Sequence, residues 1–206
     1  MSVTVSGRKR LEYDPDISYV AFVDMSGGSS DDAVLAIAHH DAETGRAVLD
    51  LLVSQTGKPP FNPRHAVRKF AGILKAWGLR RVHGDAYAGQ TFRADFGEQA
   101  IAYQVAMLPK TGIYDALEPK LNAGEVELLD IRQLQEQLLT LVIRNGKIDH
   151  QPGDHDDYAN AAAGALWLVS SQADAIIAEP IVMITSYNRF GAIGGLTPPP
   201  DWRTVW

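Results

Sequence analysis

The stretch Tyr19-Val-Ala-Phe-Val-Asp24, followed by the turn Met25-Ser-Gly-Gly-Ser-Ser30, indicates the fold of this chain. Two more apolar runs follow it, Ala33 to Ala38 and Ala47 to Ser54, with a polar turn at 41–45 between them. Short apolar runs bounded by turn residues are typical of strands, and short connections join antiparallel neighbours. The sequence therefore predicts a three-stranded antiparallel meander over residues 19–54.

Downstream of the meander, strand-like and helical patterns alternate. Helical spacing and end signals predict a helix from Pro63 to a stop at Gly78, one near 91–98, one over 113–121 that ends at Gly124, one that Asp130 caps and that carries Leu134, Leu138 and Leu141, and one over 156–170. Strands are expected at 81–85, 102–107 and 125–129. An α/β class follows, in which a mixed β-sheet of three antiparallel strands and later parallel strands is flanked by helices.

Length and composition favour one globular domain. The 206 residues can bury a sizeable core, and we expect residues 1–17 to be an arm or linker, 18–172 the domain, and 173–206 a tail with a strand-like segment at 181–185. The absence of cysteine excludes disulfides and thiolate metal sites. The apolar runs are too short for a membrane span, and residues 1–10 lack a signal-peptide pattern. We expect a cytoplasmic protein with no membrane partner.

The formal net charge of −6 argues at first against a nucleic-acid partner. Basic residues nevertheless gather at 8–10, 64–69 and 144–147, and bound cations would reverse the sign of an acidic site. Charge alone leaves DNA binding open.

Acidic residues recur at the ends of expected elements: Asp24, Asp85, and the group Asp154, Asp156 and Asp157. Divalent cations prefer oxygen ligands, and two-metal phosphodiester hydrolysis needs carboxylates from separate elements at one place. Each acid also has a structural interpretation, since Asp24 suits a turn, Asp85 a turn or cap, and acids at a helix start favour the helix dipole. Three acids together repel one another unless a cation is bound. His155 suits a supporting group, a proton carrier or an exposed side chain.

Four segments together resemble the nuclease domain of the large terminase subunit of tailed bacteriophages: Val20-Ala-Phe-Val-Asp-Met-Ser-Gly-Gly28, Gly84-Asp-Ala-Tyr-Ala-Gly89, Val126-Glu-Leu-Leu-Asp130 and His150-Gln-Pro-Gly-Asp-His-Asp-Asp-Tyr-Ala-Asn-Ala161. The resemblance covers about residues 18–172. It implies a ribonuclease H-like fold and a Mg²⁺- or Mn²⁺-dependent endonuclease with two ions that cuts double-stranded concatemeric viral DNA. It also implies Asp24, Asp85 and Asp157 as catalytic metal ligands, with Asp156 beside them, and an ATPase motor, a small terminase subunit and a portal as partners.

Some features depart from that family, and other functions stay open. The 206 residues contain no Gly-x-x-x-x-Gly-Lys-Ser/Thr loop, so the chain is an excised domain or a free-standing nuclease-like protein. Asp154 is an extra acid, which leaves the third ligand open between Asp154, Asp156 and Asp157. The alternatives are a junction resolvase or another ribonuclease H-like nuclease, an actin-like nucleotide-binding protein that uses Ser26-Gly-Gly-Ser29, and a non-catalytic DNA-docking module.

Overall fold

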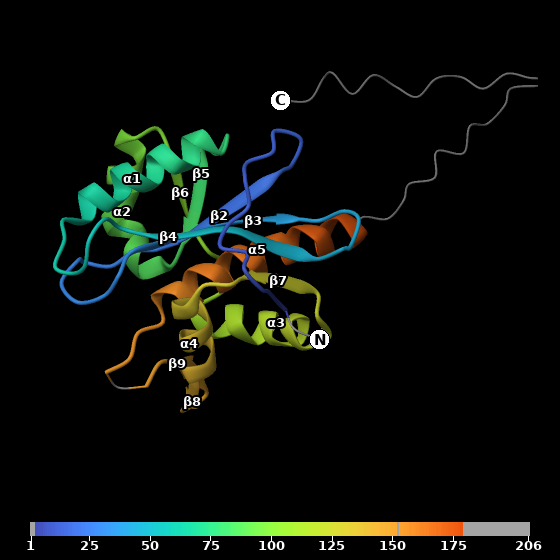
Figure 1. The fold of residues 1–206 in the computed structure, drawn as a ribbon. Coiled ribbons are helices and arrows are strands. Elements are labelled where there is room, and N and C mark those ends of the chain that lie inside the picture. The colour runs from blue at the N-terminus through green and yellow to red at the C-terminus, as the bar shows by residue number, and fades with distance from the viewer. Residues whose placement is uncertain (1–2, 152, 179–206) are drawn as a thin grey trace, which may run out of the picture.

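A seven-stranded mixed sheet forms the centre of the molecule (Figure 1). The computed structural model describes residues 3–151 and 153–178. The strand order is β1-β7-β4-β3-β2-β5-β6. The strands are β1 (Thr4–Val5), β2 (Tyr19–Asp24), β3 (Val34–His40), β4 (Ala47–Ser54), β5 (Arg81–Gly84), β6 (Ala102–Val105) and β7 (Val126–Leu129). β2, β3 and β4 pair antiparallel, whereas β5, β6, β7 and β1 join through parallel pairs. The predicted meander and the mixed sheet are confirmed.

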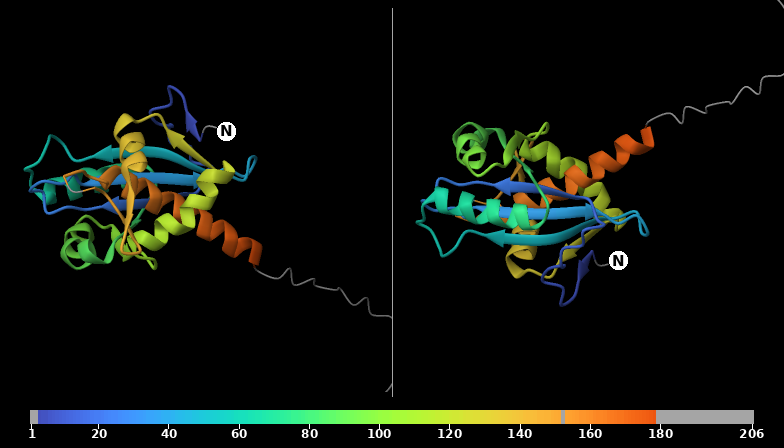
Figure 2. Two further views of the ribbon diagram at one scale, coloured as in Figure 1. Left: turned by 90° about the horizontal axis from the view of Figure 1, so that it is seen from below. Right: turned by 90° about the horizontal axis from the view of Figure 1, so that it is seen from above.

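Helices cover both faces of this sheet, as Figures 1 and 2 show. Because successive strand residues point to opposite faces, Phe22 packs on one side and Val23 on the other. The first face carries α3 (Lys110–Ala123), α4 (Arg132–Thr140) and α5 (Asp157–Ala178), and α5 contacts β2, β3 and β4. The second face carries α1 (Pro63–Ala76) and α2 (Ala86–Glu98). The sheet therefore has a hydrophobic core on each side.

The ends of α1 follow from local sequence. Asn62 accepts a hydrogen bond from the amide of Arg64 at 3.0 Å, and Pro63 occupies the first turn, where its missing N–H costs nothing. Gly78, just beyond the helix, has φ +69°, a conformation that glycine adopts at low cost. The buried stripe includes Val67, Phe70 and Leu74, so the predicted helix and its stop are confirmed.

The helix predicted to start at Asp130 and to carry Leu141 needs correction. Asp130 does not cap α4, which begins one residue later after Ile131 and ends before Leu141. The Asp130 carboxylate instead accepts a hydrogen bond from the amide of Gly7 at 2.9 Å and pairs with Lys9. These contacts, together with strand β1 beside β7, fasten the N-terminal segment to the sheet edge.

The chain also forms a hairpin of β8 (Val142–Arg144) and β9 (Lys147–Asp149) that the strand and helix patterns did not predict. Its turn residues Asn145 and Gly146 have φ +50° and +73°, the conformation for which Asn-Gly hairpins are suited. That dipeptide was the available signal.

Other differences concern element ends. α2 and α3 begin earlier than predicted, and α5 extends to Ala178. The strand-like segment at 181–185 lies outside the described residues. Within the described part of the chain, no helix has the length and apolar character needed to cross a membrane.

Candidate active site

Two of the predicted acids lie at the carboxyl ends of adjacent parallel strands. β2 pairs with β5 in a register that places Val23 opposite Gly84, so Asp24 and Asp85 are the next residues along each strand. Gly84 is needed there, because an added Cβ would lie 2.1 Å from the Tyr103 hydroxyl and 2.9 Å from the Val23 carbonyl oxygen. In sheets of this kind, the carboxyl ends of parallel strands are the usual position of functional groups.

Helix α5 brings the third acidic group to the same strand ends. It approaches β2 closely at Gly164, where an added Cβ would lie 2.4 Å from the Phe22 ring. Near the start of the helix, the Asn160 amide donates a hydrogen bond to the Asp24 carboxylate at 2.8 Å. Gly164, which allows this approach, thus lies about one turn beyond Asn160, which meets Asp24.

The acids at the start of α5 do not serve as its caps. The side-chain oxygen of Gln137 on α4 accepts hydrogen bonds from the amides of Tyr158 and Ala159 at 2.8 and 3.0 Å. A neighbouring helix therefore satisfies first-turn N–H groups that a capping aspartate would otherwise accept. The carboxylates of Asp156 and Asp157, both buried, remain available for other contacts.

The three candidate acids of this motif have different surroundings. Asp157 accepts a hydrogen bond from the amide of Asp32, in the loop after β2, at 3.2 Å. Asp156 forms an ion pair with Lys110 of α3, and Lys110 also pairs with Asp149 at 2.8 Å. Asp154 is exposed in the preceding loop. The structure therefore separates Asp154 from the two buried acids.

His155 is also exposed, and its Nδ1 lies 3.1 Å from the Asp31 carboxylate. Of the three interpretations of His155 given above, this position agrees with an exposed side chain.

Burial and mutual repulsion perturb the acids. Burial raises the pKa of Asp24 to about 8, the hydrogen bond from Asn160 opposes that rise, and the charges of Asp157, Asp85 and Asp156 add to it. Burial likewise raises the pKa of Asp157 to about 6, against the hydrogen bond from Asp32. Carboxylates from β2, the end of β5 and the start of α5 thus act on one another through space.

Lys110 partly offsets this negative charge. Burial lowers the pKa of its ammonium group, but hydrogen bonds to Asp149 and Asp156 and the charges of both acids raise it above its ordinary value. Lys110 therefore remains charged at neutral pH, next to the start of α5.

The arrangement suits divalent cations. Its donors are carboxylate oxygens, and Asn160 Oδ1 is buried with no hydrogen-bond partner among the described residues. Hard cations take such oxygen ligands, and a bound cation would remove the repulsion that raises the pKa of Asp24. The residues present fit Mg²⁺ or Mn²⁺.

Sequence reasoning missed three residues of this site: Asn160, Gln137 and Lys110. Asn160 follows Asp157 by three residues on a predicted helix. Residues at this spacing lie on the same helix face, so the sequence could have indicated that Asn160 is near the site. No local pattern pointed to Gln137 or Lys110, because their partners lie on other elements.

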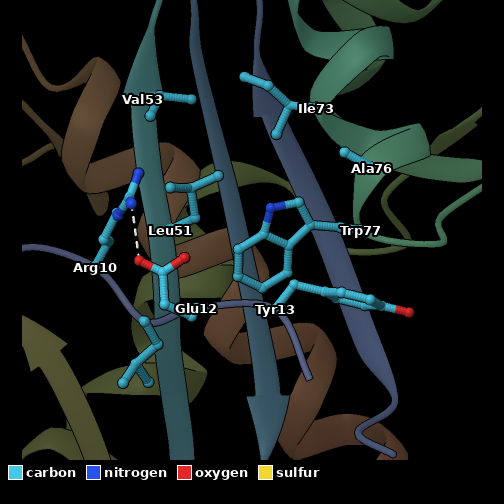
Figure 3. A pocket seen from close by; sticks show the side chains of 9 residues that line it. Arg10, Glu12, Tyr13, Leu51, Val53, Ile73, Ala76 and Trp77 are labelled. Atoms are coloured by element: carbon cyan, nitrogen blue, oxygen red, sulfur yellow. Dashed lines mark hydrogen bonds and ion pairs between the residues drawn. The ribbon is translucent and has the colours of Figure 1, made fainter. Parts of the chain in front are cut away.

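A separate cavity of about 310 Å³ lies between β4, the end of α1 and residues 10–13 (Figure 3). Trp77 and Tyr13 line it, together with Leu51, and Arg10 pairs with Glu12 at its rim at 2.8 Å. Tyr19, at the opposite end of β2 from Asp24, packs on Trp77 with ring centroids 4.9 Å apart. The residues that line this cavity include none of the candidate acids.

Known structures resemble this molecule although sequences do not. No protein-family model and no curated protein matches the chain. The large terminase nuclease from thermophilic phage G20c is 18% identical, with a TM-score of 0.63, over 75% of this chain and 84% of that one. The same nuclease with bound magnesium is 17% identical, with a TM-score of 0.63, over 76% and 84%. The HK97 bacteriophage large terminase is 14% identical, with a TM-score of 0.61, over 78% of this chain but 41% of that one.

The fold is therefore the ribonuclease H-like fold of large terminase nuclease domains.

Proposed function

We propose that this chain is an endonuclease that uses Mg²⁺ or Mn²⁺ to hydrolyse phosphodiester bonds of double-stranded DNA. The observation that carries the proposal is the convergence of Asp24, Asp85 and Asp157 from three elements, close enough for two of them to raise the pKa of the third. The magnesium-bound phage nuclease of the same fold supports the choice of cation.

Asp24 is the central ligand in this proposal, because it lies between the end of β5 and the start of α5. Asp85 and Asp157 complete the site, with Asp156 beside them, and Asn160 holds the Asp24 carboxylate in place. Two divalent ions about 4 Å apart would lower the pKa of the attacking water and stabilise the leaving oxygen. Lys and Arg side chains nearby would hold the phosphate backbone without reading the bases.

The biological setting we propose is the cutting of concatemeric viral DNA during genome packaging, in the host cytoplasm. Residues 18–172 would be the nuclease domain, with 1–17 as an arm and 173–206 as a tail. An ATPase motor, a small terminase subunit and a portal would be the partners, and the motor's activity would come from outside these 206 residues.

Cleavage of supercoiled plasmid tests the proposal. We expect nicked and linear products with Mg²⁺ or Mn²⁺ and none with EDTA, because unneutralised acids cannot activate a water. Asp24→Asn should be inactive yet folded, while the matched control Asp154→Asn should cut like the wild type. Undiminished cleavage in EDTA would refute metal dependence. Preference for four-way junctions or RNA/DNA hybrids over linear duplex would favour a resolvase or a hybrid-specific nuclease instead.

A further inference from the structure

The hairpin β8–β9 places a second group of ligands beside the start of α5. One ligand atom from each of Asp149, His150 and Asp156 lies within 4.8 Å of the others. The hairpin is held there by α3, where the Thr111 hydroxyl accepts a hydrogen bond from the amide of Ile148 at 3.2 Å. The group thus combines two residues that end β9 with the first buried acid of α5.

His150 is oriented as a metal-binding histidine. Its Nδ1 lies 2.9 Å from the carbonyl oxygen of Gln151. A carbonyl can only accept, so Nδ1 carries the proton and the neutral ring leaves a lone pair on Nε2. Nε2 lies 3.8 Å from Asp149 Oδ1. A backbone carbonyl on the other ring nitrogen is the usual support of a histidine that binds a metal.

A buried hydroxyl without a hydrogen-bond partner lies close enough to the acids of both groups to feel their charge. Tyr114 lies one turn after Lys110 on α3, is 5% exposed, and its hydroxyl has no hydrogen-bond partner among the described residues. Burial raises the pKa of this hydroxyl well above its ordinary value, and the charges of Asp156, Asp24, Asp149 and Asp157 add to the rise. A buried hydroxyl without a partner is costly, and bound water or an ion's hydration shell would satisfy it.

The ammonium group of Lys110 occupies the position between these acids where a metal ion would bind. The Lys110 ammonium pairs with Asp149 at 2.8 Å and contacts Asp156, the same two carboxylates that belong to the ligand group.

We propose that Asp149, His150 and Asp156 form a divalent-cation site distinct from the one centred on Asp24, and that the Lys110 ammonium is its competing occupant. An imidazole ligand favours Mn²⁺ over Mg²⁺ at this site, because Mg²⁺ takes oxygen ligands almost exclusively. The site shares Asp156 with the proposed catalytic centre but does not require Asp24 or nuclease activity.

The test measures Mn²⁺ binding by calorimetry and by electron paramagnetic resonance in the Asp24→Asn background, which removes the first site. Adding Lys110→Met should introduce one further Mn²⁺ per chain or raise Mn²⁺ affinity at least about tenfold, since a nearby positive charge is lost. Mg²⁺ should show a smaller gain. The matched control Lys120→Met, also on α3, should change nothing.

Adding His150→Ala to the Lys110→Met protein should abolish the gain. Lys110→Gln provides a second variant, and circular dichroism establishes that each protein is folded. Unchanged Mn²⁺ binding in a folded Lys110 variant would overturn the proposal, as would a gain that survives His150→Ala. Neither outcome affects the plasmid assay that tests the catalytic site.

Discussion

Replacement of Asp24 by Asn should stabilise the metal-free protein at alkaline pH. The substitution keeps the shape of the side chain, and the amide oxygen can still accept the hydrogen bond from Asn160. It removes a carboxylate whose ionisation is opposed by burial and by the neighbouring acids. The charge of Asp24, which the proposed cleavage reaction requires, would then lower the stability of the metal-free protein.

The magnitude follows from the pKa of Asp24. The pKa rises from 3.8 to about 8. At about 1.4 kcal/mol for each pH unit, ionised Asp24 can lower the free energy of unfolding by at most about 6 kcal/mol. Asp24 keeps some contact with solvent, which screens part of this, so we expect about 2–4 kcal/mol. The folded state binds the Asp24 proton more tightly than the unfolded state, so the wild type keeps its full stability below about pH 4 and loses this amount, about 2–4 kcal/mol, as the pH rises through about 8.

Urea unfolding in EDTA at several pH values between 4 and 9 would measure this. The free energy of unfolding of the wild type should fall with pH relative to Asp24→Asn, and the gap should reach its largest value at about pH 8–9, above which it no longer grows. The variant should keep a smaller pH dependence below pH 6 from Asp157, whose pKa is about 6. Mg²⁺ at pH 8 should stabilise the wild type more than the variant. Parallel curves for the two proteins would refute the electrostatic account, and Asp154→Asn serves as the exposed control.

Three further predictions concern α5. Under saturating Mg²⁺, Asp157→Ala should abolish plasmid cleavage and Asp154→Ala should leave it near wild type; the reverse result would show that the third ligand is misassigned. Gly164→Ala should force the helix away from Phe22 and reduce both cleavage and thermal stability, because the added methyl overlaps the ring, and a wild-type melting temperature would contradict that packing. Gln137→Ala should lower the free energy of unfolding by about 1 kcal/mol through loss of the helix cap, with an unchanged value in urea unfolding counting against it.

Local patterns were sufficient for much of the fold. The apolar runs of β2, β3 and β4 and the buried stripe of α1 each depend on residues a few positions apart, so the sequence predicted these elements almost to their ends. Asp130 shows where such reasoning fails. An aspartate before a helical pattern is a good cap, yet contacts with Gly7 and Lys9, distant in sequence, determine its position.

The candidate site divides in the same way. Asp24, Asp85 and Asp157 were selected by chemistry and by their places at element ends, which the sequence displays. Whether all three bind one pair of ions stays a prediction for the metal-binding and cleavage assays. Lys110 and Gln137 could not be selected from the sequence, because their partners lie on other elements and no local pattern points to them.

The sequence by itself determined which segments become strands and helices and which acids stand at their ends, because hydrophobic periodicity and turn chemistry act over short distances. Only the tertiary structure decided the strand order that sets Asp24 beside Asp85, the cap that Gln137 supplies to α5, and the pairing of Lys110 with Asp149 and Asp156. Those contacts join segments far apart in the chain, and the packing of both sheet faces brings them together.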